Sequence, residues 1–405
     1  MKILHTSDWH LGQKLLSNDR FEEHQLALDW LIDLIEKEAI EILIISGDIF
    51  DVYNPPNYAR EQYFRFLKKM VATCCQHIII TAGNHDSPSM LGASREVLQL
   101  LDIQVVVGVK EDVKDEIIEI KNGKNELVGI VAAIPFLRDE DIRKSVAGQT
   151  DLERSEQVKK AIYDHYQAVG KAVEKYARKN IPLIATGHLY AKGAEASGKQ
   201  DNIYIGNIEN IEAEQFPTVF DYIALGHIHR SQKVGGIEKI RYCGSLIPLS
   251  FSETKDEKGV LILDFEGKKL KEINTVLVPI FRRLKTIEGT IEEVKESLIN
   301  FAQKERTMKP WVEIVIHTEQ PILNLHTDLQ EFTSEMNLEL LKISVKRKHL
   351  TLEEQIEEID LMSVDHFEVF ERKCASNGTQ PEEMNELRGT YRELSEKLED
   401  ILSED

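Results

Sequence analysis

Short apolar runs recur through the first two thirds of the 405-residue chain, and amphipathic stretches separate them. Short Ile- and Leu-rich runs are typical of buried strands. Five such runs are Ile3-Leu4-His5, Ile42 to Ile45, Ile78 to Ile80, Leu183-Ile184-Ala185 and Ile223-Ala224-Leu225. Apolar positions at helical spacing predict helices at 21–39, 57–71, 89–101 and 150–180, the last broken or bent near Gly170.

Further strands are expected at 241–243, 260–265 and 272–278. Strands that alternate with helices, followed by antiparallel strands, predict an α/β domain with a mixed sheet over residues 1–278. After Pro279 the pattern becomes that of a small α+β domain, residues 279–350. Its predicted order is strand 282–287, helix 291–303, strand 311–317, helix 324–336 and strand 338–346.

The last segment, residues 351–405, is acidic and predicted to be helical, with Gly378 and Pro381 between two helices. It holds 17 Asp and Glu against 5 Lys and Arg, so it carries −12 of the total net charge of −20. A short acidic helical pair buries little surface by itself, so we expect it to dock. Two docking surfaces remain open, namely the preceding α+β domain and a partner protein.

Side chains able to bind a metal follow each of the five predicted strands. They occur in the motifs Asp8-Trp9-His10, Gly47-Asp48, Gly83-Asn84-His85-Asp86, Gly187-His188 and Gly226-His227-Ile228-His229. Carboxylate, imidazole and amide ligands gathered at strand ends suit two divalent metals, which would lie roughly 3.5–4 Å apart. Asp48 is the natural bridging ligand because a carboxylate has two oxygens. Such a site fits phosphoester hydrolysis.

These motifs are those of the calcineurin-like metallophosphoesterases, which this chain resembles. The stretches 1–12, 47–51 with Asn54-Pro55-Pro56, and 83–88 resemble a narrower family, SbcD, the bacterial nuclease subunits of SbcC–SbcD complexes. The resemblance covers Met1 to about Ser252. It implies a fold of two packed mixed sheets flanked by helices, with 279–350 as a capping domain beside the nuclease groove.

The resemblance also implies roles for individual residues. The first metal would be held by Asp8, His10, Asp48 and His229, and the second by Asp48, Asn84, His188 and His227. His85 would be catalytic, contacting the scissile phosphate or protonating the leaving oxygen, and the two metals would be Mn²⁺. Asp51 stands where some relatives have a second histidine, so we assign it no catalytic role and expect it to orient a ligand. Asp86 is expected to be structural.

The function implied is that of a metal-dependent DNA nuclease, an exonuclease on duplex ends and an endonuclease on single strands and hairpins. It would act with the ATPase SbcC in DNA repair, recombination and replication. The resemblance further implies a homodimer through helices 57–71 and 89–101, a heterotetramer with SbcC, and docking of 351–405 on the base of the SbcC coiled coil, near its ATPase head. The alternative is a small-substrate metallophosphoesterase, such as a phosphatase or cyclic-nucleotide phosphodiesterase, because the same two metals serve both. A scaffold without chemistry fits the complete ligand set poorly.

Charge and cysteine content refine this interpretation. Residues 1–350 keep a net charge of −8, so we expect weak DNA binding without a partner. The cations flanking the motifs are candidate DNA contacts, namely Lys14, Arg20, Arg95, Arg138, Lys192 and Arg230. We expect a cytoplasmic protein outside the membrane for three reasons. The four cysteines lack metal-type spacing, we find no signal peptide, and no apolar run reaches about 18 residues. The remaining histidines are expected to be ordinary, namely His5, His24, His77, His165, His317, His326, His349 and His366.

Overall fold

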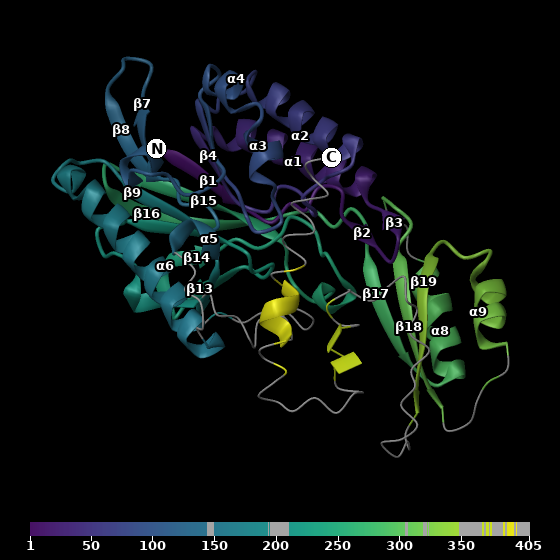
Figure 1. The fold of residues 1–405 in the computed structure, drawn as a ribbon. Coiled ribbons are helices and arrows are strands. Elements are labelled where there is room, and N and C mark those ends of the chain that lie inside the picture. The colour runs from purple at the N-terminus through teal and green to yellow at the C-terminus, as the bar shows by residue number, and fades with distance from the viewer. Residues whose placement is uncertain are drawn as a thin grey trace.

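The computed structural model describes residues 1–143, 150–192, 194, 210–303, 307–318, 322, 324–347 and thirteen positions between 367 and 394. Two six-stranded sheets and their helices form the larger part, and a three-stranded unit with two helices lies at one end (Figure 1).

The first sheet has the strand order β16-β15-β1-β4-β5-β6. Its parallel strands are β1 (Lys2–Thr6), β4 (Ile42–Ser46), β5 (His77–Thr81) and β6 (Ile103–Val106). The antiparallel neighbours β15 (Gly259–Glu266) and β16 (Lys269–Leu277) complete one edge. Every residue of β4 is buried, as expected for a central strand that is covered on both faces.

The second sheet has the order β13-β14-β12-β9-β8-β7. Its four central strands run parallel, namely β14 (Ile237–Tyr242), β12 (Tyr222–Gly226), β9 (Leu183–His188) and β8 (Leu127–Ala132). Both edge strands are antiparallel to their neighbours, namely β13 (Gln232–Val234) and β7 (Ile117–Lys121).

The two sheets pack face to face, and helices cover their outer faces. Ile3 and Ile44 of the first sheet share a buried cluster with Ile184 and Ala224 of the second. The opposite face of the first sheet packs against α1 (Phe21–Glu38), α2 (Asn57–Met70), α3 (Pro88–Gly92) and α4 (Arg95–Gln99). The opposite face of the second packs against α6 (Asp151–Val173). The predicted fold class, two packed mixed sheets flanked by helices, is confirmed.

Two helix predictions need correction. The helix expected at 89–101 is two short helices, because the chain leaves the helical conformation at Ser94 before α4 begins. The helix expected at 150–180 runs unbroken through Gly170, ends at Val173 and continues as the 3₁₀ turn η2 (Glu174–Tyr176). Gly170 serves close packing, since a Cβ there would lie 2.6 Å from Cβ of Pro217.

The small unit after Pro279 is a parallel sheet of three strands with two helices. The strands are β17 (Leu284–Gly289), β18 (Trp311–Thr318) and β19 (Glu339–Arg347), and the helices are α8 (Ile291–Ala302) and α9 (Leu325–Thr333). Its own core includes Val294, Leu298 and Ile314. Leu284 and Trp311 pack with Leu15, so the unit docks next to the turn formed by β2 (Lys14–Leu15) and β3 (Asn18–Asp19). The domain boundaries at 278 and 350 stay predictions, and so does the capping role from which this unit takes the name capping domain.

The thirteen described positions between 367 and 394 are all helical. Tyr391 stacks on Phe370 with ring centroids 4.1 Å apart and meets Phe367 edge-on at 5.3 Å. The rest of the predicted helical segment 351–405 lies outside the described residues. Among the residues that are described, no helix is long and apolar enough to cross a membrane.

Candidate metal centre

The five motifs converge at the carboxyl ends of strands from both sheets. Three motifs follow β1, β4 and β5 of the first sheet, and two come at or after the ends of β9 and β12 of the second. Carboxyl ends of parallel strands share one edge of a sheet, and Oγ of Ser46 on β4 donates a 3.0 Å hydrogen bond to the Ala224 carbonyl on β12. The structure therefore brings all eight predicted site residues to one place.

The backbone at this edge is strained in a way that aims side chains inward. Asp8 (φ 52°), His10 (φ 49°), Asp48 (φ 51°) and His227 (φ 102°) all have positive φ. Positive φ in a residue other than glycine costs on the order of 1–3 kcal/mol and tends to occur at functional sites. Hydrogen bonds hold these conformations, including Asp8 N to the Gly47 carbonyl (3.0 Å) and His227 N to Oδ1 of Asp8 (2.8 Å).

Four motif glycines are required by close approach, and Gly47 and Gly226 are two of them. Gly47 has φ +86°, and a Cβ there would lie 2.2 Å from Nδ1 of His188. A Cβ at Gly226 would lie 1.9 Å from the Ser46 carbonyl oxygen. Any side chain at these two positions would push the strand ends apart, which explains why glycine precedes Asp48 and His227.

The candidate ligand atoms form three overlapping groups, and Asp48 belongs to two of them. Asp8, His10 and His229 have candidate ligand atoms within 4.8 Å of one another, and so do Asp48, His188 and His227. A third group, His10, Asp48 and His85, links these two. Oδ2 of Asp48 lies 3.1 Å from Nε2 of His188 and 3.5 Å from Nε2 of His10. The carboxylate thus stands between the groups, where a bridging ligand has to be.

Asn84 belongs with the second group. Its Oδ1 lies 2.9 Å from Nδ1 of His227 and 3.1 Å from Nε2 of His188. These separations are those of ligands around a common cation as well as of hydrogen bonds. The geometry therefore agrees with the predicted sets for both metals, and the individual ligand roles stay predictions.

The donor set fits divalent cations. Asp8, His10, Asp48 and His188 are buried, and Nε2 of His10 has no hydrogen-bond partner among the residues that the structure describes. Burial alone would lower the pKa of His188, but Asp48 raises it to about 9. Burial is likewise outweighed at His10, whose pKa is raised to about 9 by the hydrogen bond to Asp51 and by Asp48. The site therefore attracts positive charge, which a divalent metal would supply.

Asp51 contacts both a proposed metal ligand, His10, and the proposed catalytic residue, His85. Its expected role in orienting a ligand fits these contacts. Its Oδ1 lies 3.1 Å from Nδ1 of His10, and its backbone carbonyl accepts a 2.7 Å hydrogen bond from Nδ1 of His85. Because a carbonyl can only accept, Nδ1 of His85 carries the proton, and Nε2 of the neutral ring is the unprotonated atom. Asp51 thus fixes the ring orientation of a proposed ligand and of the proposed catalytic histidine.

Asp86 has a structural environment, in line with the prediction for it. Its carboxylate accepts hydrogen bonds from three backbone amides, at Ile49 (3.2 Å), Phe50 (3.0 Å) and Gly83 (2.8 Å). Burial and the neighbouring Asp48 raise its pKa to about 6. Asp86 therefore ties the loop after β4 to the loop after β5.

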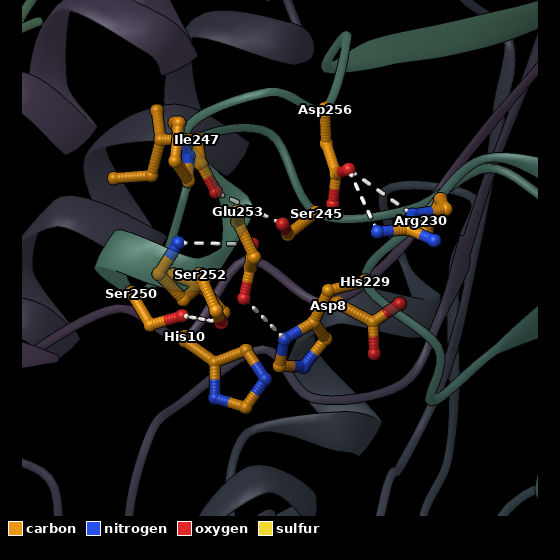
Figure 2. Close-up of polar contacts among 12 residues, drawn as sticks. Asp8, His10, His229, Arg230, Ser245, Ile247, Ser250, Ser252, Glu253 and Asp256 are labelled. Atoms are coloured by element: carbon orange, nitrogen blue, oxygen red, sulfur yellow. Dashed lines mark hydrogen bonds and ion pairs between the residues drawn. The ribbon is translucent and has the colours of Figure 1, made fainter. Parts of the chain in front are cut away.

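Sequence reasoning missed Glu253 and Lys258. Oε1 of Glu253 lies 3.3 Å from Nδ1 of His229, and Figure 2 shows the carboxylate pointing at that ring, with His10 and Asp8 close by. Lys258 pairs with Oε2 of the same carboxylate at 2.6 Å. No motif marks either residue, and Glu253 follows the end of the resembling stretch at Ser252.

The candidate DNA contacts differ in their surroundings. Arg20 is buried, pairs with Glu23 at 2.7 Å and donates to the Pro248 carbonyl, so it is unavailable to DNA. Arg230 is partly exposed and pairs with Asp256 at 3.0 Å (Figure 2). Arg138 donates to the Asp86 carbonyl at 3.0 Å. Two further candidates, Lys14 and Arg95, are exposed, and the side chain of Lys192 lies outside the described part of the chain.

Most of the remaining histidines are accounted for by their surroundings. His5 lies 3.0 Å from the Tyr222 hydroxyl, and His165 lies 2.9 Å from Glu116. His349 and His366 lie outside the described residues. Within the described residues, the other six belong to no group of three or more potential metal ligands.

Known proteins match this chain along most of its length. The family described as calcineurin-like phosphoesterase matches residues 1–231, and the one described as type 5 capsule protein repressor C-terminal domain matches 280–377. The SbcD subunit of nuclease SbcCD from Escherichia coli K12 is 36% identical over 93% of this chain and 93% of its own length. The SbcD subunit from Rhodobacter capsulatus is 29% identical over 86% of this chain and 88% of its own length.

The SbcD subunit from Bacillus subtilis is 30% identical over 65% of this chain and 66% of its own length. The match to the Escherichia coli subunit over 93% of the chain and the match to the phosphoesterase family identify the chain as a metal-dependent phosphoesterase, and the metal-ligand geometry agrees. The chain therefore belongs to the calcineurin-like phosphoesterases and, among them, to the SbcD family of nuclease subunits.

Proposed function

We propose that this chain is the DNA-cleaving subunit of a complex with an SbcC-type ATPase. It would act as an exonuclease on duplex ends and as an endonuclease on single strands and hairpins. The observation that carries the proposal is the pair of ligand groups that His10 and Asp48 link, with His85 in the linking group. The SbcD relatives supply the choice of DNA over other phosphodiesters.

The proposed centre has two ions, which we take to be Mn²⁺. When bound, they would supply an activated water and neutralise charge that develops on the phosphate. Asp8, His10, Asp48 and His229 would hold the first ion. Asp48, Asn84, His188 and His227 would hold the second.

His85 would act on the substrate. Its Nδ1 proton is held by the Asp51 carbonyl, so Nε2 is the ring atom left for the phosphodiester. The ring lies beside His10, with centroids 4.9 Å apart, which keeps it next to the first ligand group. We propose that the doubly protonated ring donates from Nε2 to a phosphate oxygen or delivers that Nε2 proton to the leaving oxygen, the usual work of a positioned imidazole.

Arg138 and Arg230 are the cations that we propose to contact DNA near the centre. The guanidinium of Arg138 lies 5.0 Å from the ring centroid of Tyr53 and bonds the carbonyl of Asp86, next to His85. Arg230 directly follows the ligand His229. With a net charge of −8 over residues 1–350, the chain alone would hold DNA weakly, and SbcC would contribute most of the affinity.

A homodimer through α2 and α4 is also proposed. Tyr63 and Phe66 of α2 are buried in the core, but Phe64, Val97 and Leu100 expose 43%, 65% and 84% of their surface. Exposed apolar side chains that gather on one face usually mark an interaction surface, and we propose that these three do so. All four cysteines are free, in keeping with the cytoplasmic location that we propose.

The experiment that tests the function uses the purified chain. It is incubated with hairpin DNA, linear duplex DNA and a small phosphodiester, with Mn²⁺ or Mg²⁺, and with or without SbcC. The proposal expects cleavage of both DNAs, increased by SbcC and abolished by Asp48→Ala. Turnover of the small phosphodiester without any DNA cleavage, in the presence of SbcC, would instead favour a small-substrate phosphoesterase.

A further inference from the structure

We propose that Glu253 is a positioning residue that fixes the ring of His229 for metal binding. The inference rests on the proposed metal centre, in which His229 is a ligand of the first ion. Glu253 lies in the 3₁₀ turn η4 (Phe251–Glu253), which is 24 residues beyond His229 in the chain.

The first step is the contact between the two side chains. Oε1 of Glu253 lies 3.3 Å from Nδ1 of His229, and Figure 2 shows the carboxylate aimed at the ring edge. An ionised carboxylate can only accept, so Nδ1 of His229 is the donor. That leaves Nε2 as the nitrogen able to bind a cation, beside the ligand atoms of Asp8 and His10.

The second step is that the carboxylate is itself held in place. Its Oε2 accepts hydrogen bonds from Nζ of Lys258 (2.6 Å) and from the backbone amide of Leu249 (3.1 Å). Lys258 also donates to the backbone carbonyl of His229 at 2.8 Å. One buried ion pair thus holds both the ring and the backbone of the ligand, with Glu253 2% and Lys258 7% exposed.

The third step is that other proposed ligand histidines have the same kind of support. Nδ1 of His10 faces the carboxylate of Asp51 at 3.1 Å, and Nδ1 of His188 faces the Ser46 carbonyl at 2.9 Å. Metal-binding histidines usually have their second ring nitrogen bound in this way, which fixes the tautomer and the ring angle. Glu253 supplies this contact for His229. An ion pair between Glu253 and Lys258 that only stabilised the fold would not require a contact to the His229 ring.

The turn that carries Glu253 is held from the other side by the capping domain. Phe251, at the start of η4, packs with Leu284 and Trp311 of that domain. A turn fixed between the metal ligand and the capping domain cannot easily rotate Glu253 away from His229. The docked position of the capping domain therefore contributes to holding this ligand.

The test measures metal binding without DNA. Metal-free wild type, Glu253→Gln and Glu116→Gln are each dialysed against a series of Mn²⁺ concentrations, and bound manganese is counted by elemental analysis. Glu116 is the matched control, because it is also buried and lies 2.9 Å from a histidine, His165, outside the proposed centre. Glu253→Gln should lower the affinity for one of the two ions about 10–100-fold and leave the affinity for the other unchanged. Glu116→Gln should bind both ions with wild-type affinity.

A spectroscopic measurement separates positioning from stability. Co²⁺ absorption reports the ligand geometry, so its visible bands should change in Glu253→Gln and stay unchanged in Glu116→Gln, even if both variants unfold at lower temperature. If Glu253→Gln fails to fold, the double variant Glu253→Gln, Lys258→Met is measured instead. It removes both charges of the buried ion pair, so neither is left unpaired.

His229→Ala is the reference for the ligand set. If His229→Ala keeps both ions, the proposed centre is wrong and the failure does not concern Glu253. If His229→Ala loses one ion while Glu253→Gln binds both with wild-type affinity and an unchanged Co²⁺ spectrum, the positioning role is overturned. Neither result depends on whether the chain cleaves DNA.

Discussion

The backbone carbonyl of Asp51 accepts a hydrogen bond from Nδ1 of His85 at 2.7 Å. The carboxylate of the same residue faces Nδ1 of His10 at 3.1 Å, so one loop position orients both the proposed catalytic residue and a proposed ligand. A substitution at Asp51 would remove the side-chain contact to His10 and keep the backbone contact to His85, so the two contacts are separable.

Replacing His85 by Gln should reduce the rate of DNA cleavage while both metals stay bound. Nε2 of His85 is proposed to touch the substrate, and a positioned acid–base group usually contributes about 10²–10⁴-fold. Rates with Mn²⁺ and the metal content of the variant are measured together. A nuclease rate near that of wild type contradicts the role, and a missing ion would make His85 a ligand instead.

Asp48→Ala should remove more metal than His10→Ala. Oδ2 of Asp48 lies between His188 and His10, at 3.1 Å and 3.5 Å, whereas His10 belongs to the first ligand group and faces the second only through Asp48. Elemental analysis of both variants, dialysed against the same Mn²⁺ concentration, decides this. Equal losses of one ion in both variants would place the bridge at another residue.

The site ligands can be predicted from the sequence because each follows a short apolar strand, and four of the five motifs contain a glycine that the structure requires for close approach. The residues that support the ligands cannot be predicted in this way. Glu253 meets His229 only after the chain has passed through β13 and β14 and returned to the site, so neither periodicity nor spacing marks it. Long-range contacts of this kind depend on the tertiary fold.

Two errors in the predicted fold have local causes. The hairpin of β7 and β8 is absent from the predicted elements, although Asn122-Gly123 between two apolar runs is a strong turn signal. Gly170 is predicted to bend its helix because glycine weakens helices, but it is needed where α6 packs closely on Pro217. A glycine that serves packing and one that bends a helix are indistinguishable until the neighbour is known.

Trp311→Ala should loosen the capping domain from the nuclease domain. The Trp311 ring lies 4.2 Å from the guanidinium of Arg282, is 3% exposed and packs with Leu15. Truncating a buried tryptophan costs about 3–5 kcal/mol of unfolding free energy, and here the loss falls on the joint between domains. Calorimetry should show two separated transitions.

Ile314→Ala is the control for that variant, because Ile314 lies in the core of the capping domain. It should lower the stability of the capping domain while leaving the joint intact. A single coincident transition in Trp311→Ala, unchanged from wild type, would mean that the joint contributes little to holding the domains together.

Leu100→Glu should shift the chain from dimer to monomer. Leu100 is 84% exposed at the end of α4, so a charge there leaves the fold intact, within about 0.5 kcal/mol, but opposes apolar contact between two copies. Light scattering across a concentration series measures the mass. Leu277→Glu, an exposed leucine on β16, is the control and should leave the mass unchanged. If both variants remain dimeric, the α2–α4 surface is not the seam.

The acidic segment 351–405 should be needed for SbcC binding and dispensable for turnover of a small phosphodiester. All proposed ligands lie at or before His229, so deletion of 352–405 should leave the metal centre intact. Within the segment, Phe367, Phe370 and Tyr391 pack on one another, whereas Leu387 and Leu394 remain 40% and 61% exposed. Exposed leucines on a helix suit docking on a partner helix.

Leu387→Ser combined with Leu394→Ser is therefore the sharper test of docking, because the aromatic contacts stay in place. The double variant should lose at least about tenfold in SbcC affinity, since a few central apolar residues supply most of the binding energy of an interface. Co-purification and titration with SbcC measure the effect, and turnover of the small phosphodiester should equal that of wild type. If the deleted chain folds and still binds SbcC with unchanged affinity, the segment docks elsewhere, and packing on its own capping domain becomes the better explanation.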